Sequence, residues 1–177
     1  TGAHAMKPGE RPQDRKASTD NKAPVVALVE RGGKVRSMHI ANVTGANLKQ
    51  ALKENIDPSA HIMTDEAPHY KFVSKQYNRH STINHREYEY SRLEADGILA
   101  SVNTVEGFFS LLKRGVYGSF HHVSKQHLQS YLSEFDFRYN ARKMDDGERR
   151  QLAIKGARGK RLTYYPVKGG ETNSVLN

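Results

Sequence analysis

The chain has 177 residues, 36% of them hydrophobic, so it can form one domain of ordinary size around a modest core. It contains no cysteine, which excludes a disulfide scaffold and a zinc site built on thiolates and agrees with a reducing compartment. The formal net charge is +9, and five of these charges arise in residues 141–177. Such a basic chain suits a polyanion such as DNA, although solubility alone would also explain the charge.

Residues 1–22 are predicted to form a flexible arm, because their prolines, small polar residues and charges leave nothing to bury. Residues 1–6 have the character of a cloning remnant followed by an internal start at Met6, so we expect a fragment of a longer protein. No apolar run approaches the roughly 20 residues of a membrane span, and no secretory leader opens the chain. We therefore expect no membrane partner and a cytoplasmic location.

Residues 24–29 form a short apolar run rich in β-branched residues, which predicts a buried strand. A tight turn at Arg31–Lys34 and an alternating segment at residues 35–41 complete a predicted hairpin. Thr44 can cap a helix over residues 45–54, which ends before Asp57-Pro58.

Further elements follow the hairpin. Strands are predicted at residues 61–64 and 81–85, with a short helix between them, and residues 86–100 are expected to form a loop. One helix is predicted over residues 102–114 and is expected to break at Gly115 and Gly118. Ser124 can cap a second helix that carries an apolar stripe from Leu128 to Tyr139. This order predicts an α/β fold with a mixed sheet.

Asp65 is the first residue that could carry chemistry. It follows the short apolar segment 61–64, so a strand would hold its carboxylate rigidly while the head group meets solvent. Hard cations such as Mg²⁺ bind oxygen ligands of this kind. The alternative is an ordinary acid in a turn at the end of a strand.

Glu106 is the second such residue. It borders the apolar stripe of the predicted helix 102–114, so its carboxylate can be directed into a cleft beside the sheet. Alternatively, Asn103 and Thr104 cap this helix, and Glu106 interacts favourably with the helix dipole.

Basic residues gather between the two last predicted helices and beyond them. Contact with DNA phosphates is one interpretation, and solvated helix ends are the other. The candidates for phosphate contact are Lys113, Arg114, Arg138, Arg142 and Lys160. Adjacent histidines at positions 121 and 122 point apart on a regular element and do not favour a zinc site.

Several separated motifs, in order, resemble the DDE transposases of the bacterial ISXO-like insertion sequences. They cover residues 22–165 and are Ala23–Gly33, Thr64–Tyr70, Asn103–Gly115, Phe135–Asn140 and Gly156–Leu162. The resemblance implies an RNase H-like fold, a mixed sheet flanked by helices, with residues 23–140 as the core and 141–177 as a basic tail. It also implies metal-dependent cleavage of DNA ends and strand transfer into a target.

Carried over to this chain, the resemblance makes Asp65 the second acid of the motif and Glu106 the third, with two Mg²⁺ or Mn²⁺ ions in the complete enzyme. It implies double-stranded DNA, both transposon ends and target, as the partner. It also implies that the protein forms a homo-oligomer and that it is located in the bacterial cytoplasm, associated with the nucleoid.

The first acid of the family has no counterpart here, because Asp14 and Asp20 lie in polar sequence and follow no apolar run. The N-terminal cysteine-rich zinc module of the family is also absent. Truncation and decay of the gene both explain these departures. We expect the chain by itself to be inactive and to lack the first strand of its sheet. An RNase H-like nuclease and an inactive DNA-binding remnant are alternative interpretations.

Overall fold

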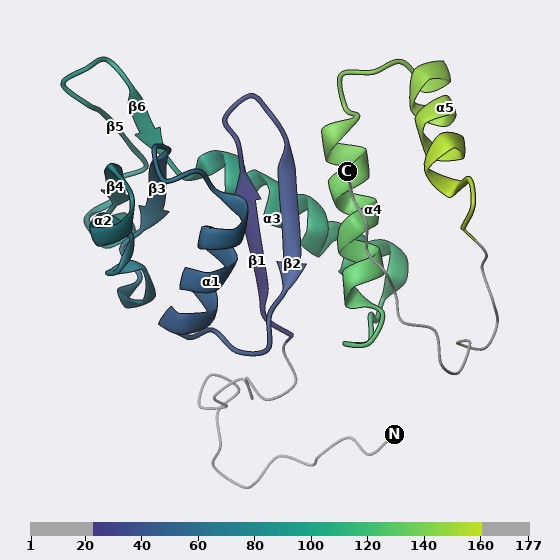
Figure 1. The fold of residues 1–177 in the computed structure, drawn as a ribbon, viewed down its shortest axis with the longest axis horizontal. Coiled ribbons are helices and arrows are strands. Elements are labelled where there is room, and N and C mark those ends of the chain that lie inside the picture. Colours follow the sequence, from purple (N-terminus) through teal and green to yellow (C-terminus); the bar gives the residue numbers. More distant parts are fainter. Residues whose placement is uncertain (1–22, 161–177) are drawn as a thin grey trace, which may run out of the picture. The chain divides into compact units, whose positions relative to one another are not determined.

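The computed structural model describes residues 23–160 and divides the chain into two compact units, residues 1–140 and 141–177. Figure 1 labels the elements along the chain. Among residues 23–160, the first unit holds six strands and four α-helices, described below, and the second holds one α-helix. The chain is therefore a mixed α/β protein, as the sequence predicts.

Strands β1 (Val25–Val29) and β2 (Val35–His39) form the predicted antiparallel hairpin. Val25 pairs with His39 and Val29 pairs with Val35. The turn closes with a hydrogen bond from the Glu30 amide to the Lys34 carbonyl. Gly32 lies in the left-handed region at φ +70°, which glycine adopts without steric cost.

Strands β3 (His61–Asp65) and β4 (Arg79–Ile83) pair in parallel, and the connection between them contains η3 (Pro68–Tyr70) and α2 (Val73–Gln76). The described strands form three separate two-stranded sheets, β1–β2, β3–β4 and β5–β6. A continuous RNase H-like sheet is thus not formed by the described residues.

The prediction of a loop over residues 86–100 is wrong. After η4 (His85–Glu87), strands β5 (Ser91–Leu93) and β6 (Leu99–Ser101) form an antiparallel hairpin. The Glu94 amide donates to the Ile98 carbonyl, and Gly97 adopts φ +80°. Asp96-Gly97 is a turn signal, but only three residues on each side pair, too few for a clear alternating pattern.

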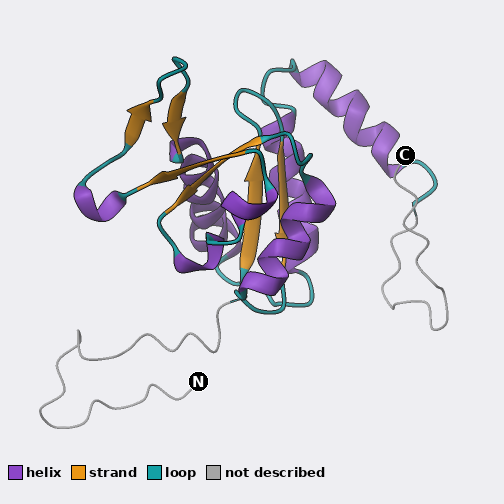
Figure 2. Cartoon of the chain, turned by 60° about the vertical axis from the view of Figure 1, so that its left-hand side comes forward, coloured by secondary structure: helices purple, strands orange, loops and turns teal. Residues whose placement is uncertain are grey.

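Helix α1 (Gly45–Asn55) begins where the sequence predicts, because the Thr44 hydroxyl accepts a hydrogen bond from the Asn47 amide. Helices α3 (Asn103–Gly115) and α4 (Leu128–Asn140) form most of the remaining helical structure of this unit. Strand β1 is covered on both faces, as Figure 2 shows for the hairpin. Leu28 packs against the cluster that Leu52 of α1 forms with Val73 and Tyr77. Val25 packs against the cluster that Leu112 of α3 forms with Leu128 and Leu132.

Gly115 is the last α-helical residue of α3, as predicted, but the chain remains helical beyond it. Helix α3 continues directly into the π-helix η5 (Val116–Phe120), which contains Gly118. A Cβ atom on Gly115 would lie 2.2 Å from Cζ of Phe135 in α4. The glycine therefore allows the aromatic ring to approach the helix backbone, a requirement that comes from packing and not from helix termination.

Three polar side chains of α4 hydrogen-bond the outer edge of β2. Asn140 accepts from the Val35 amide at 2.7 Å and donates to the Val35 carbonyl at 2.9 Å. Asp136 accepts from the Ser37 amide at 2.7 Å and from its hydroxyl at 2.6 Å. Gln129 accepts from the His39 amide and donates to the Ser37 carbonyl. The helix thus closes this sheet edge without adding a strand.

The second unit contains helix α5 (Asp146–Ala157), in the region expected to be a basic tail. A capping box starts it: the Asp145 carboxylate accepts from the Glu148 amide, and the Glu148 side chain accepts from the Asp145 amide. No helix among residues 23–160 is long and apolar enough to cross a membrane.

Candidate functional site

The carboxyl ends of β3 and β4 lie at one edge of their sheet. The strands are parallel and Asp65 pairs with Ile83. As a result, Asp65 and Glu66 at the end of β3 lie beside Asn84 and His85, which follow β4. Parallel pairing therefore brings together four polar residues that are about 20 positions apart in the sequence.

Asp65 ends β3 and its Oδ1 atom accepts a hydrogen bond from the Ala67 amide at 3.1 Å. This bond is the one expected of a turn carboxylate, and it also orients the group. Burial raises the pKa of the nearby Tyr70 hydroxyl, and the Asp65 charge raises it further.

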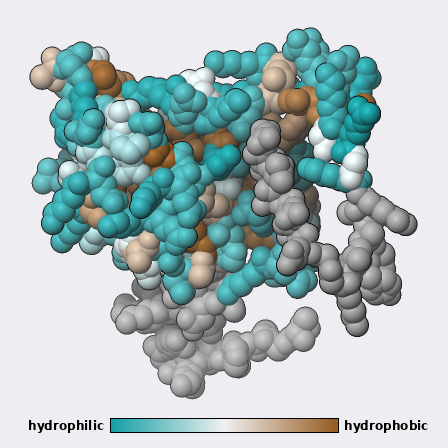
Figure 3. Space-filling view, in the orientation of Figure 1, coloured by the Kyte–Doolittle hydropathy of each residue, from teal (hydrophilic) through white to brown (hydrophobic). Residues whose placement is uncertain are grey.

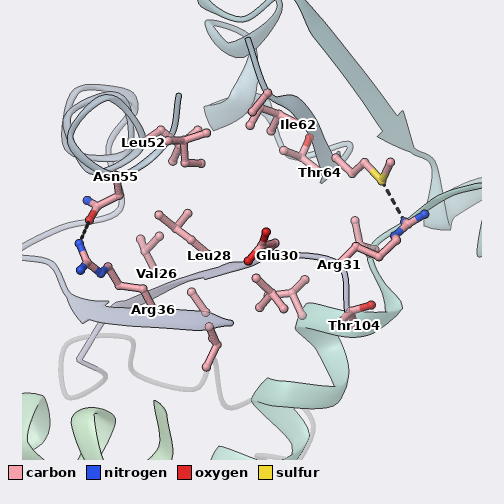
Figure 4. A pocket seen from close by; sticks show the side chains of 18 of the residues that line it. Val26, Leu28, Glu30, Arg31, Arg36, Leu52, Asn55, Ile62, Thr64 and Thr104 are labelled. Atoms are coloured by element: carbon pink, nitrogen blue, oxygen red, sulfur yellow. Dashed lines mark hydrogen bonds between the residues drawn. The ribbon is translucent and has the colours of Figure 1, made fainter. Parts of the chain in front are cut away.

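Glu106 lies in the first turn of α3, and its side chain is 55% exposed. Asp65 and Glu106 line the same cavity of about 970 Å³, together with Thr104. Strand β3 and helix α3 thus each contribute one acid to the lining of this cavity. Figure 4 shows Thr64 of β3 and Thr104 of α3, which also line it.

His85 connects Glu66 and Glu106. The Nε2 atom of its ring lies 3.3 Å from Oε1 of Glu106, and its backbone amide donates to Oε2 of Glu66 at 3.1 Å. The amide of Glu66 itself, that of His85 and the positive charge of Arg86 lower the pKa of the Glu66 carboxyl. His85 is not among the site residues predicted from the sequence, although its position at the end of the predicted strand 81–85 was a usable signal.

Two polar atoms at this edge lack hydrogen-bond partners. Oδ1 of Asn84 and Nε2 of His85 are shielded from solvent, and neither makes a hydrogen bond within the described part of the chain. The 3.3 Å contact of His85 with Glu106 is close but poorly aligned. Buried polar atoms without partners are uncommon, and an ion or ligand in the site would satisfy them.

The comparisons with known proteins identify the family. A family model described as the ISXO2-like transposase domain matches residues 2–140. The chain belongs to this transposase family. No curated protein and no solved structure matches it. Membership indicates a role in DNA transposition, with DNA as substrate, and transposases of the DDE type generally use divalent metal ions.

The two acids of this transposase domain only partly fit the metal centre of such enzymes. Within residues 23–160, no three histidine, aspartate or glutamate side chains come together as a metal-binding group. Asp65 and Glu106 would offer two anionic ligands, whereas two divalent ions carry four positive charges. The described residues therefore fall short of a two-ion centre.

The five basic candidates do not lie on one element. Lys113 and Arg114 lie in the exposed last turn of α3. Arg138 on α4 pairs with Glu134 at 2.6 Å, so part of its charge is already engaged. Arg142 and Lys160 belong to the second unit and are exposed.

Proposed function

We propose that residues 23–140 are the catalytic-core region of a DDE-type transposase and that Asp65 and Glu106 are two of its metal-binding carboxylates. The observation that carries this proposal is that the two acids, from a strand and a helix 41 positions apart, line one cavity. The unpartnered atoms of Asn84 and His85 at the same sheet edge add support. The hairpin β1–β2 and the pair β3–β4 would be parts of one RNase H-like sheet.

Asp65 and Glu106 would hold a divalent metal ion, which would supply Lewis-acid chemistry for phosphodiester cleavage and joining. The role of this chain is to hold carboxylates in place, Asp65 through its bond with the Ala67 amide and Glu106 beside the His85 ring. The basic residues at the end of α3 would bind the DNA backbone. We also propose that the protein acts on transposon ends and target DNA as a homo-oligomer.

The chain by itself is expected to bind one Mg²⁺ or Mn²⁺ ion weakly and to cleave or join no DNA, because two carboxylates do not balance two divalent ions. Calorimetric titration with Mn²⁺ tests the site. Asp65→Asn and Glu106→Gln should each abolish the binding. Glu87→Gln removes an exposed acid from η4, outside the cavity, and should leave it unchanged.

Equal loss of Mn²⁺ binding in all three variants, or none in any, would reject Asp65 and Glu106 as ligands. Strand transfer by the chain alone, abolished by Asp65→Asn, would overturn the expected inactivity. The shortage of a third acid among residues 23–160 favours a second candidate, a DNA-binding remnant without catalysis. DNA binding with no affinity for Mn²⁺ would point to this remnant.

A further inference from the structure

Two tyrosines that follow η4 are largely exposed beside the candidate site. Tyr88 is 83% exposed and Tyr90 is 61% exposed, and we call them the tyrosine pair. The ring centroid of Tyr90 lies 6.0 Å from that of His85. Nε2 of His85 lies 3.3 Å from Oε1 of Glu106. One side chain, that of His85, therefore connects the tyrosine pair with a proposed metal ligand.

Tyr88 adopts a backbone conformation that tyrosine rarely takes. It ends η4 in the left-handed region, at φ 59° and ψ 22°. Glycine is the usual residue at such a position, because a Cβ atom makes this conformation unfavourable. At 83% exposure, Tyr88 recovers little of that cost through burial. A bulky residue in a strained and exposed position points to a ligand for its side chain.

Glu89 fixes the turn that presents the two rings. Its Oε2 atom accepts a hydrogen bond from the Asn84 amide at 2.8 Å, and its own amide donates to the Asn84 carbonyl at 3.2 Å. Its Oε1 atom accepts from the guanidinium of Arg92 in β5 at 2.6 Å. The tyrosines on either side of Glu89 are thus held by a fixed turn, so a ligand need not order this backbone when it binds.

The chemistry of the tyrosine pair suits unpaired nucleobases. An aromatic ring stacks on the face of a base, and this face is free in a single strand but covered by neighbouring bases in a continuous duplex. The cations nearby are already engaged, because Arg86 pairs with Glu66 at 3.6 Å and Arg92 pairs with Glu89. Stacking on bases, and not attraction of phosphates, is therefore the interaction that this surface offers.

The adjacent β5–β6 hairpin distinguishes base stacking from binding of a protein. Leu93 and Leu99 pair across this hairpin and are 69% and 47% exposed. In Figure 3, brown hydrophobic residues are visible at the upper left, where Figure 1 draws the hairpin. An apolar protein surface would bury these aliphatic side chains together with the tyrosines. A stacked base needs the aromatic rings alone.

We propose that Tyr88 and Tyr90 stack on unpaired bases of the DNA strand that reacts at the Asp65–Glu106 site, an inference that rests on the proposed function of these two acids. The substrate then includes a single-stranded segment next to the reacting phosphodiester. In an uncut duplex, base pairs must open before the tyrosine pair can bind, as they do for other proteins that take bases out of the stack.

Fluorescence titration of the full chain tests the proposal, in the presence of EDTA so that metal plays no part. The probe is a short duplex with a single-stranded overhang at each end that carries 2-aminopurine, a base whose fluorescence falls when it stacks. We expect the unaltered chain to quench this probe and to bind it about fivefold or more tightly than a blunt duplex of the same sequence.

Variants of the tyrosine pair should lose this preference. Tyr88→Gly and Tyr90→Leu should each weaken binding of the overhang probe by about fivefold or more, whereas Tyr88→Phe retains the ring and should retain the affinity. The slope of log K against log salt should not change, because no phosphate contact is removed. Tyr88→Gly also relieves the strained backbone, so its Tm should rise, and the loss of affinity is then not due to unfolding. Leu93→Ala should bind the probe like the unaltered chain.

Three outcomes would overturn the proposal. One is equal affinity for overhang and blunt duplexes, and another is equal loss of affinity in Tyr88→Gly and Leu93→Ala. The third is a reduced salt slope in Tyr88→Gly. Titration with Mn²⁺ separates the fate of the metal site. If Asp65→Asn abolishes Mn²⁺ binding but the overhang is not preferred, the tyrosine pair alone is rejected. An overhang preference without Mn²⁺ binding would retain base stacking and reject the metal ligands.

Discussion

The Nε2 atom of His85 lies 3.3 Å from Oε1 of Glu106, and the two residues come from a turn after β4 and from the first turn of α3. The ring nitrogen is shielded from solvent and has no aligned hydrogen bond within the described residues. His85 thus holds a position beside a proposed ligand, where it can restrict the rotamers of Glu106.

Replacement of His85 tests this positioning role. We expect His85→Ala to weaken Mn²⁺ binding by about 10–100-fold, as the loss of a group that orients a metal ligand typically does. His85→Gln retains an N–H donor and should restore part of the affinity. His69→Ala removes an exposed histidine from η3 and should have no effect. Equal affinities of His85→Ala and the unaltered chain, measured by calorimetry, would contradict the role.

The hydrogen bonds that Asn140, Asp136 and Gln129 of α4 make with the backbone of β2 should contribute strongly to stability. Asp136→Leu leaves the amide and hydroxyl of Ser37, which is 3% exposed, without a partner. We expect a loss of about 1–3 kcal/mol in the free energy of unfolding, measured with urea. Glu134→Ala, on the same helix, removes only an exposed ion pair and should cost less than about 0.5 kcal/mol. Equal losses in the free energy of unfolding of the two variants would show that the Asp136 hydrogen bonds contribute no more to stability than an exposed ion pair.

Asp136 should also make stability depend on pH. Burial raises the pKa of its carboxyl, against the lowering by the Ser37 hydrogen bonds and by Arg36. The folded state then retains the proton at a pH where the unfolded state has released it. Its contribution to stability is full below the ordinary value of 3.8 and is lost as pH rises through the raised pKa. Urea unfolding from pH 3 upward should show this fall in the unaltered chain and not in Asp136→Asn.

Substitution of two glycines of α3 by alanine should change the stability of the protein in opposite directions. Gly115→Ala places a Cβ atom 2.2 Å from Phe135, so the ring or the helix must shift, at a cost of about 1–3 kcal/mol. Gly107→Ala meets nothing within 4 Å and should stabilise the helix by about 0.5–1 kcal/mol. Thermal unfolding compares the two. Destabilisation by Gly107→Ala as large as that by Gly115→Ala would refute the packing explanation.

The salt dependence of DNA affinity tests the basic residues of α3. If Lys113 and Arg114 contact phosphates, each alanine variant should reduce the slope of log K against log salt by about 1 on a short duplex. Arg138→Ala should reduce it less, because Arg138 already pairs with Glu134. Lys53→Ala, at the end of α1, serves as the control. Slopes identical to that of the unaltered chain would remove Lys113 and Arg114 from the DNA interface.

Local patterns were sufficient for several elements. The apolar run before a glycine-containing turn predicts the β1–β2 hairpin, and Thr44 predicts the start of α1, because strand pairing across a tight turn and helix capping involve neighbouring residues. The β5–β6 hairpin and α5 were missed although Asp96-Gly97 and the Asp145–Glu148 capping box signal them. Both signals are local, but they lie in polar sequence without the apolar periodicity that usually identifies a strand or a helix.

Motif order and periodicity along the chain were enough to predict the family, the α/β class and the two candidate acids. Which side chains meet depends instead on how the elements pack against one another. Parallel pairing placed His85 beside the acids, the ring of Phe135 explained Gly115, and α4 closed one sheet edge while the edges of β1 and β3 remained open. These contacts join residues distant in the chain, and the packing of whole elements, not local propensity, selects them.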